Sequence, residues 1–289
     1  MTPLHLLITG ATGQTGRETL RSLLAAGTPH TFSAGLRQPD RMPSDLAGAL
    51  PVRFDFEDPA SFPPALAGVD RVFLLRPPQL ADIRIFRPLI AAMQAEQVRE
   101  IVFLSVQGAE KSRIIPHNQI ERLIREAGLR YIFLRPAYFM QNLTSTLLPG
   151  IRQDREIFLP AGRAPFNWVD VQDVGAAAAQ AMLRFDALEG QICVLTGTEN
   201  LRFGEAAEII REETGLPVRF TDPGPLRFYL RKRREGMESG KILAMLMLHY
   251  LARFQPEPEI SGTLGTLLGR PPGTLRAYIR RELLPALQG

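Results

Sequence analysis

The first two-thirds of the chain alternates short apolar runs with amphipathic stretches. Runs that are apolar along their whole length are typical of parallel strands buried on both faces, and stretches with apolar positions three and four residues apart are typical of helices. The predicted strands are Leu4–Thr9, Thr31–Leu36, Val52–Asp55, Arg71–Leu75, Ile101–Ser105 and Tyr131–Arg135. The predicted helices between them are Arg17–Ala26, Ser61–Leu66, Asp82–Glu96 and Asn118–Glu126. Right-handed crossovers turn this order into an α/β fold with a doubly wound parallel sheet.

The pattern changes in the last third of the chain. A helix over Val171–Arg184 and a strand over Gln191–Thr196, at the edge of the sheet, continue the alternation. Beyond Asn200 the chain is mostly helical. The elements predicted there are helices at Phe203–Thr214, Arg227–Glu235 and Lys241–Phe254, a short strand at Val218–Thr221 and a last helix from about Thr274. We therefore expect a sheet domain of residues 1–198 and a smaller, mostly helical lobe of residues 199–289, packed over the carboxyl ends of the strands.

A glycine-rich turn joins the first predicted strand to the first predicted helix. Gly10 permits a tight turn, Gly13 lets the backbone approach a phosphate, and Gly16 lets the helix pack on the sheet. The free N–H groups and the positive dipole end of the helix then face an anion. This context predicts a seat for the pyrophosphate of a dinucleotide; the alternative is a merely structural turn. The residues of the seat are Gly10, Thr12, Gly13, Gln14, Thr15 and Gly16.

The end of the second strand bears on which dinucleotide binds. An acidic residue there bonds the ribose hydroxyl of NAD, whereas an arginine accepts the 2′-phosphate of NADP. Arg37 stands at this place, and no carboxylate follows until Asp40. A guanidinium can donate two parallel hydrogen bonds to a phosphate, so the sequence favours NADP(H) over NAD(H). The alternative is that Arg37 is a solvated loop residue.

Two further strand ends belong to the same expected crevice. Asp55 follows the third strand and could bond the adenine amine, with Phe56 beside the ring; alternatively, Asp58 caps a helix there. The fourth strand contributes the expected wall of the nicotinamide pocket, namely Leu75, Arg76 and Pro77.

Composition narrows the choice of partners. The chain has 289 residues, of which 45% are hydrophobic and 22% charged, as in an ordinary globular protein. The net charge is +4, with one dense patch at Arg231–Arg234. A solvated helix end explains such a patch more often than nucleic acid does, so we expect no nucleic-acid partner.

The expected compartment is the cytoplasm. The single cysteine, Cys193, lies in an apolar run, so we expect a buried thiol and no internal disulfide. No signal peptide is recognised, and no apolar segment approaches the ~20 residues that span a bilayer, so we expect no membrane partner. We also expect no metal site.

Seven segments along the chain match one known family in their order and spacing. They are Thr9–Gly16, Arg37–Pro39, Phe103–Ala109, His117–Glu121, Leu134–Leu143, Asn167–Gly175 and Gly269–Pro272. Together they resemble the NmrA-like family of the atypical short-chain dehydrogenase/reductase superfamily. The resemblance implies a Rossmann fold and NAD(P) binding over essentially the whole chain. The family contains NADPH-dependent quinone and enone reductases, and also redox-sensing regulators that bind the dinucleotide without turnover.

The chain departs from the wider superfamily at the reactive site. Reductases there carry a serine after the fifth strand and a Tyr-x-x-x-Lys motif, in which the lysine lowers the pKa of the tyrosine. No Tyr-x-x-x-Lys occurs here; His117 and Glu121 stand at the matching place, with His117 twelve residues after Ser105. One interpretation makes His117 a proton donor that Glu121 orients, with Ser105 beside them. The other makes His117 a helix-start residue and Glu121 a structural partner.

The segment after the sixth strand is the candidate substrate wall. Tyr138 and Phe139 are flat and apolar, and Asn142 is a polar anchor, although aromatic clusters more often belong to a core. Phe166 and Trp168 are expected in the core. The first hypothesis is an NADPH-dependent oxidoreductase acting on a small quinone-like or activated carbonyl substrate. The second is a non-catalytic NAD(P)-redox-sensing protein, with a regulatory protein partner or a homodimer as its assembly.

Overall fold

The structure is a computed structural model and describes residues 2–77, 80 and 82–288. The chain forms two compact units, each assembled from three stretches of sequence. Unit 1 comprises residues 1–136, 171–195 and 262–271, and unit 2 comprises 137–170, 196–261 and 272–289. The sequence analysis expected one boundary after residue 198. The chain instead leaves unit 1 after Pro136, because the strand at 166–169 pairs with strands of unit 2.

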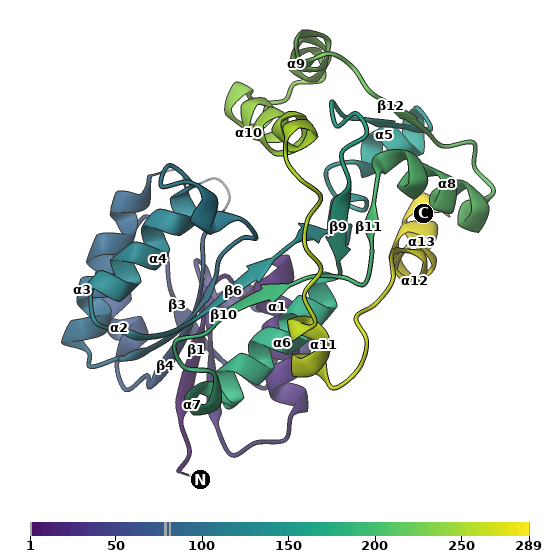
Figure 1. The fold of residues 1–289 in the computed structure, drawn as a ribbon. Coiled ribbons are helices and arrows are strands. Elements are labelled where there is room, and N and C mark those ends of the chain that lie inside the picture. Colours follow the sequence, from purple (N-terminus) through teal and green to yellow (C-terminus); the bar gives the residue numbers. More distant parts are fainter. Residues whose placement is uncertain (1, 78–79, 81, 289) are drawn as a thin grey trace. The chain divides into compact units, whose positions relative to one another are not determined.

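Unit 1 is built on a seven-stranded parallel sheet in the order β10-β6-β5-β4-β1-β2-β3 (Figure 1). This order is a doubly wound Rossmann-like sheet, and every strand predicted for it is confirmed, including the edge strand β10. The strands are β1 (His5–Ile8), β2 (Thr31–Leu36), β3 (Leu50–Arg53), β4 (Arg71–Leu75), β5 (Glu100–Leu104), β6 (Arg130–Pro136) and β10 (Ile192–Leu195).

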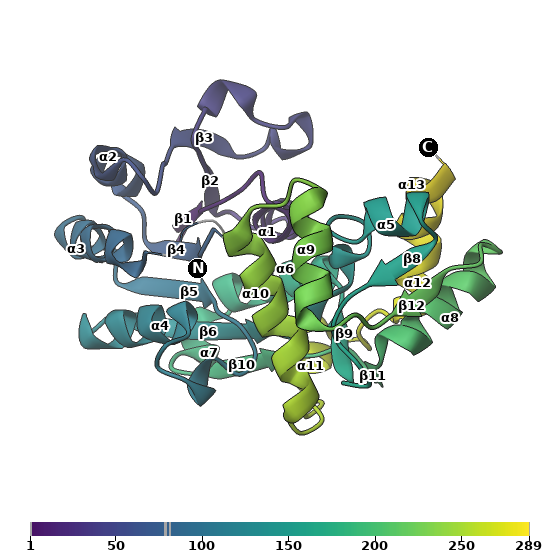
Figure 2. The ribbon, with the colours of Figure 1, turned by 90° about the horizontal axis from the view of Figure 1, so that it is seen from above.

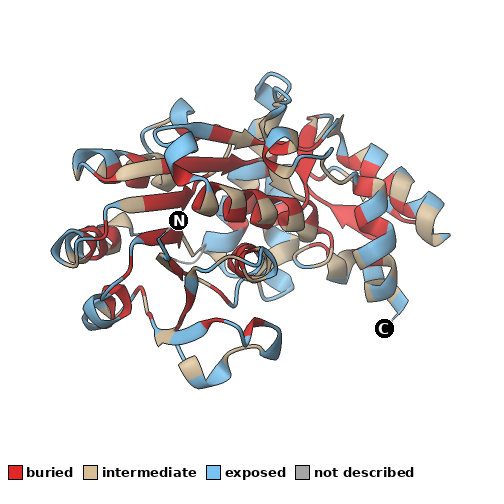
Figure 3. Cartoon of the chain, turned by 90° about the horizontal axis from the view of Figure 1, so that it is seen from below, coloured by how far each residue is buried: buried red, intermediate tan, exposed pale blue. Residues whose placement is uncertain are grey.

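Helices cover both faces of this sheet, as Figures 1 and 2 show. One layer contains α2 (Phe62–Leu66), α3 (Phe86–Ala95) and α4 (Pro116–Glu126). The other contains α1 (Gln14–Ala25), α6 (Val171–Leu183) and α11 (Thr263–Leu268), with the short α7 (Phe185–Leu188) after α6. The strands between the two edges of the sheet, β6, β5, β4, β1 and β2, are largely buried (Figure 3), which explains why their sequences are largely apolar. The edge strand β3 is mostly exposed. Cys193 is a buried free thiol on β10, as expected.

Unit 2 combines helices with two small sheets. The predicted helices are confirmed as α8 (Phe203–Thr214), α9 (Pro225–Arg234) and α10 (Ser239–Tyr250), and the predicted last helix as α12 (Leu275–Tyr278) continuing into α13 (Leu284–Gln288). In the first sheet the central strand β9 pairs with β7 and with β11, and in the second sheet β8 pairs with β12. Their strands and the remaining helix are β7 (Tyr138–Phe139), β8 (Glu156–Phe158), β9 (Phe166–Val169), β11 (Asn200–Leu201), β12 (Arg219–Thr221) and α5 (Leu148–Gln153).

The sequence analysis missed four of these five strands, β12 being the exception. They have only two to four residues, too few for an alternating pattern to show. Unit 2 is held by an aromatic core in which Trp168 and Phe166 are 1% and 6% exposed, as expected. No helix in the described part of the chain has the length and apolar character needed to cross a bilayer.

Candidate functional site

The glycine-rich turn lies directly after β1 and is anchored to β4. The Thr9 hydroxyl donates to the Phe73 carbonyl oxygen at 3.0 Å and accepts the Leu75 N–H at 3.2 Å. Gly10 has a φ of +60°, the left-handed region that glycine tolerates best. A Cβ on Gly16 would lie 2.3 Å from the Gly10 carbonyl oxygen, so only glycine lets α1 begin this close to the turn.

The first turn of α1 fits an anion. No side chain in the described structure caps this helix, and its first turn contains no acidic residue. Thr12, Gly13 and Gln14 are exposed in front of it. The backbone N–H groups and the positive end of the helix dipole are therefore open to a phosphate. The turn thus has the shape and the polarity that a pyrophosphate requires.

Arg37 emerges from the neighbouring strand. β2 pairs with β1 in parallel, so the segments that follow them lie at the same edge of the sheet. Arg37 is exposed and forms no ion pair with any described carboxylate. It is therefore available to a ligand phosphate, and Asp40 nearby is also exposed.

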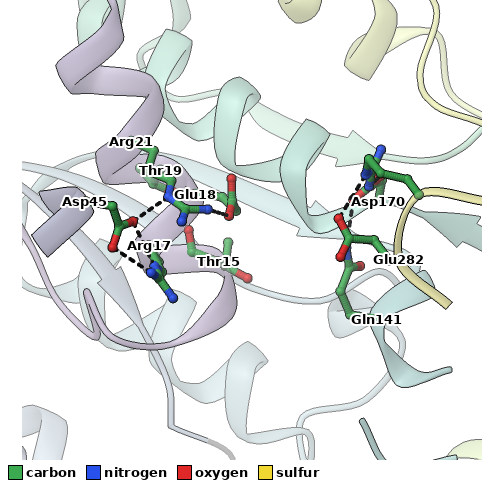
Figure 4. A network of polar contacts seen from close by, with 10 residues as sticks. Thr15, Arg17, Glu18, Thr19, Arg21, Asp45, Gln141, Asp170 and Glu282 are labelled. Carbon is green, nitrogen blue, oxygen red and sulfur yellow. Dashed lines mark hydrogen bonds and ion pairs between the residues drawn. The ribbon is translucent and has the colours of Figure 1, made fainter. Parts of the chain in front are cut away.

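The loop that begins at Arg37 is tied to α1. Figure 4 shows Arg17 and Arg21, both on α1, reaching the carboxylate of Asp45. The closest approach of each guanidinium to an Asp45 oxygen is 2.6 Å. These bonds hold the pKa of Asp45 well below its usual range, so the clamp keeps its charges at neutral pH. The clamp limits the freedom of the loop that carries Arg37.

The end of β3 differs in part from the expectation. Phe56 is 8% exposed and packs edge-on against Phe54, at 5.0 Å between ring centroids, so its ring belongs to the core and is not free to lie beside an adenine. Asp55 is half-buried and accepts the Glu57 N–H at 3.1 Å. Asp58 caps a short 3₁₀ helix through the Ala60 N–H, which was the alternative interpretation of this segment.

The end of β4 lies against the turn. A Cβ on Gly10 would be 2.9 Å from the Leu75 methyl groups, so Leu75 packs directly on the turn. Arg76 folds back and donates to the carbonyl oxygens of Pro77 and Leu80, at 3.1 and 2.8 Å. Leu75, Arg76 and Pro77 are all half-buried. Their placement after β4, next to β1, is the one that a crevice wall needs.

Ser105 and Glu121 are joined in a buried network with Arg135. The Ser105 hydroxyl donates to a Glu121 oxygen at 2.6 Å. Arg135 donates to both Glu121 oxygens, at 2.9 and 2.6 Å, and to Glu110 at 2.5 Å. The side chains of Glu121 and Arg135 are 1% and 7% exposed. Both Glu121 oxygens are therefore engaged, and no hydrogen bond between Glu121 and His117 is formed.

His117 has an electrostatic environment opposite to the expected one. Burial, reinforced by the positive charge of Arg76, lowers the pKa of His117 to about 4, and Glu121 opposes this shift only in part. One of the two interpretations of the sequence made His117 a proton donor that Glu121 orients. At neutral pH the imidazole is instead uncharged and offers one donor and one acceptor nitrogen.

Tyr138, Phe139 and Asn142 all lie in unit 2, just beyond β6. Tyr138 is half-buried, and its ring meets Phe166, Trp168 and Phe203 at centroid distances of 5.0 to 5.7 Å. Burial raises the pKa of Tyr138, which also bonds Asn142. Phe139 is half-buried on β7. The tyrosine ring thus contributes to the aromatic core.

With this geometry in view, the family can be settled by comparison with known proteins. Residues 4–229 match the model of the NmrA-like family. The chain belongs to the NmrA-like family. The match spans the glycine-rich turn, the seven-stranded sheet and the part of the unit 2 core that precedes residue 230.

Two relatives that carry enzyme names are similar to this chain over most of its length. The (4-alkanoyl-5-oxo-2,5-dihydrofuran-3-yl)methyl phosphate reductase of Streptomyces griseus is 34% identical over 76% of this chain and 77% of its own length. The NAD(P)H azoreductase of Xenophilus azovorans is 29% identical over 95% of this chain and 96% of its own length.

A solved structure shares the fold over nearly the whole chain. An NADPH-dependent quinone oxidoreductase from Escherichia coli superposes with a TM-score of 0.83 at 25% identity, over 95% of this chain and 98% of that chain. Its complex with NADPH superposes with a TM-score of 0.86 at 24% identity, over 98% and 100%.

Sequence reasoning missed one residue in unit 2 of this NmrA-like chain. His249 is 3% exposed, with Nε2 3.1 Å from the Tyr138 hydroxyl and Nδ1 2.7 Å from the Met245 carbonyl oxygen. A carbonyl only accepts, so Nδ1 holds the proton and Nε2 accepts from Tyr138. The two residues are 111 positions apart, and no local signal connects them. Within the described residues, no group of three or more metal-ligating side chains is found.

Proposed function

We propose that this chain is an NADPH-dependent oxidoreductase that reduces a quinone-like or activated carbonyl acceptor. The observation that carries the proposal is the uncapped start of α1 behind the glycine-rich turn, with the unpaired Arg37 on the neighbouring strand. The NADPH-dependent and reductase names of the relatives support the same chemistry.

Each residue of the crevice has a role in this proposal. The backbone from Gly10 to Gly16 binds the pyrophosphate, and Arg37 binds the 2′-phosphate. Asp55 bonds the adenine side, while Leu75, Arg76 and Pro77 line the nicotinamide side. A bound nicotinamide supplies the hydride, and the protein supplies its position.

The acceptor class follows from what the site offers. The Ser105 hydroxyl already donates to Glu121, and His117 is uncharged at neutral pH. A simple ketone needs a well-placed acid when it receives a hydride. A quinone or an activated enone delocalises its negative oxygen and can take its proton from water or a neutral donor. Tyr138, Phe139 and Asn142 are proposed as the contacts for such a planar acceptor.

Replacing Arg37 tests the choice of cofactor. Arg37→Ser removes the guanidinium that meets the 2′-phosphate, so the Kd for NADPH should rise by about 10- to 100-fold while the Kd for NADH stays nearly constant. Fluorescence titration of both nucleotides measures this. Arg99→Ser is the matched control, because Arg99 is an exposed arginine next to the amino end of β5. Equal losses for both nucleotides would contradict the assigned role of Arg37.

Turnover is a separate question with its own assay. Purified protein is incubated with NADPH and a panel of quinones and enones, and the near-ultraviolet absorbance of NADPH is followed. We expect oxidation of NADPH that depends on the acceptor. No loss of absorbance above the protein-free rate with any acceptor would refute the enzymatic proposal.

A second candidate function is a non-catalytic sensor of the dinucleotide redox state. The engaged Ser105 and the uncharged His117 favour it, since neither provides a charged acid. The sensor predicts clearly different affinities for NADP⁺ and NADPH, and a protein partner bound in only one of the two states. Equal affinities together with normal turnover would exclude it.

A further inference from the structure

Exposed apolar side chains gather on one helical hairpin of unit 2. The hairpin comprises α9, α10 and the 3₁₀ turn Leu251–Phe254, together residues 225–254. It contains seven of the eleven exposed large apolar side chains in the described structure. Leu226, Met247 and Phe254 are the most exposed of the seven, at 71%, 64% and 72%. Contiguous exposed apolar surface of this kind marks a site of interaction.

The second helix of the hairpin is apolar on every side. Ile242, Met245 and His249 face the core of unit 2, whereas Leu243 and Met247 point away from it and are 53% and 64% exposed. A helix that is apolar all round is normally covered all round. Figures 1 and 2 show α9 and α10 side by side, so the exposed side chains of both helices belong to one helix pair.

Positive charge is concentrated on the same hairpin. Residues 225–254 contain seven lysines and arginines and two glutamates, a net charge of +5, whereas the other 259 residues sum to −1. Some of these cations are neutralised within the unit; Arg231, for example, meets Glu156 at 2.7 Å. Four of them form no ion pair with any described carboxylate: Arg227, Arg233, Arg234 and Lys241.

We propose that the α9–α10 hairpin binds the surface of an anionic lipid bilayer. The free cations would meet the lipid headgroups, and the apolar side chains would enter the boundary between headgroups and acyl chains. A second copy of this chain is the weaker fit, because two hairpins of net charge +5 repel each other. A nucleic-acid duplex keeps the faces of its bases stacked inside and exposes mainly charged phosphates, so it offers little surface that could cover seven large apolar side chains. The proposal is independent of the redox chemistry proposed above.

This binding is peripheral. The expectation of no membrane partner came from the absence of an apolar segment long enough to span a bilayer, and an interfacial helix pair needs no such segment. α9 contributes three of the four unpaired cations, whereas α10 and the 3₁₀ turn contribute five of the seven exposed apolar side chains.

Vesicle co-sedimentation of the full chain tests the proposal. We expect binding to phosphatidylcholine vesicles that contain phosphatidylglycerol, at least about tenfold tighter than to phosphatidylcholine alone, and weakened by salt. Leu243→Ser/Met247→Ser removes apolar surface, and Arg233→Gln/Arg234→Gln removes two free charges. Each double variant should weaken binding by about tenfold or more.

Matched controls lie on unit 1. Ile114→Ser removes an apolar side chain that is 82% exposed, and Arg87→Gln/Arg113→Gln removes two exposed charges; neither should weaken vesicle binding.

Absence of binding to anionic vesicles, or equal binding by all variants, would overturn the proposal. A dimer in light scattering that Leu243→Ser/Met247→Ser disrupts would instead assign the surface to a second copy. Titration of NADPH in parallel keeps this test separate from the cofactor proposal.

Discussion

At the scale of single residues, Glu121 shows that the role of a buried carboxylate depends on which hydrogen-bond donors surround it. The sequence places Glu121 four residues after His117, on one helix face, where the two could interact. In the structure Arg135 and Ser105 bind Glu121, and together they satisfy both carboxylate oxygens. A guanidinium that meets a carboxylate through two hydrogen bonds outcompetes a neutral imidazole. Glu121 therefore links α4 to the ends of β5 and β6.

Neutralising Glu121 should be costly. Glu121→Gln leaves the buried Arg135 without its bidentate partner, so we expect the free energy of unfolding to fall by about 3 kcal/mol. Urea denaturation measures this. Glu126→Gln is the control on the same helix, because Glu126 is 61% exposed and its pair with Arg122 should contribute less than about 0.5 kcal/mol. Similar losses in the two variants would show that the buried network is not the cause.

At the scale of elements, the start of α1 depends on two separate devices. Gly16 allows the helix to begin against the Gly10 carbonyl oxygen, and Asp45 ties the helix to the loop that carries Arg37. The first device is visible in the sequence as spaced glycines. The second is not, because Asp45 lies 28 and 24 residues from the two arginines it binds.

A methyl group at Gly16 should displace the start of α1. Its Cβ would lie 2.3 Å from the Gly10 carbonyl oxygen, so the turn or the helix must shift. We expect Gly16→Ala to weaken NADPH binding by at least about tenfold, because the backbone N–H groups at the start of α1 would no longer point at the phosphate. Calorimetric titration checks this. Gly204→Ala on α8 meets nothing within 4 Å and should leave NADPH binding unchanged, while stabilising the helix by up to about 1 kcal/mol.

At the scale of the whole molecule, each of the two units contains a histidine that burial keeps uncharged. The pKa of His117 in unit 1 and that of His249 in unit 2 are both lowered to about 4. An unfolded histidine titrates near 6.5, so between these values the unfolded chain binds more protons than the folded one. The protein must therefore lose stability as the pH falls through this window.

Acid titration of stability checks this linkage. The free energy of unfolding should decrease from about pH 6.5 to pH 4, with each histidine changing the unfolding equilibrium constant by at most about tenfold per pH unit. Denaturant titrations at several pH values give the slope. His117→Phe should make the slope shallower. A slope identical to that of the unsubstituted protein would show that His117 is not buried in its neutral form.

The sequence by itself determined the elements of secondary structure and the turn that depend on local patterns of residues. The parallel strands, their helices and the glycine-rich turn are encoded within windows of about ten residues by hydrophobic period and backbone sterics. Only the tertiary structure decided which distant residues meet. In the tertiary structure residues 137–170 belong to unit 2, and Phe56 lies in a core. Glu121 binds Arg135, and Tyr138 contacts His249. These outcomes depend on the path of the chain in space, because the partner of a buried polar group is selected by competition among all groups within reach and not by neighbours in sequence.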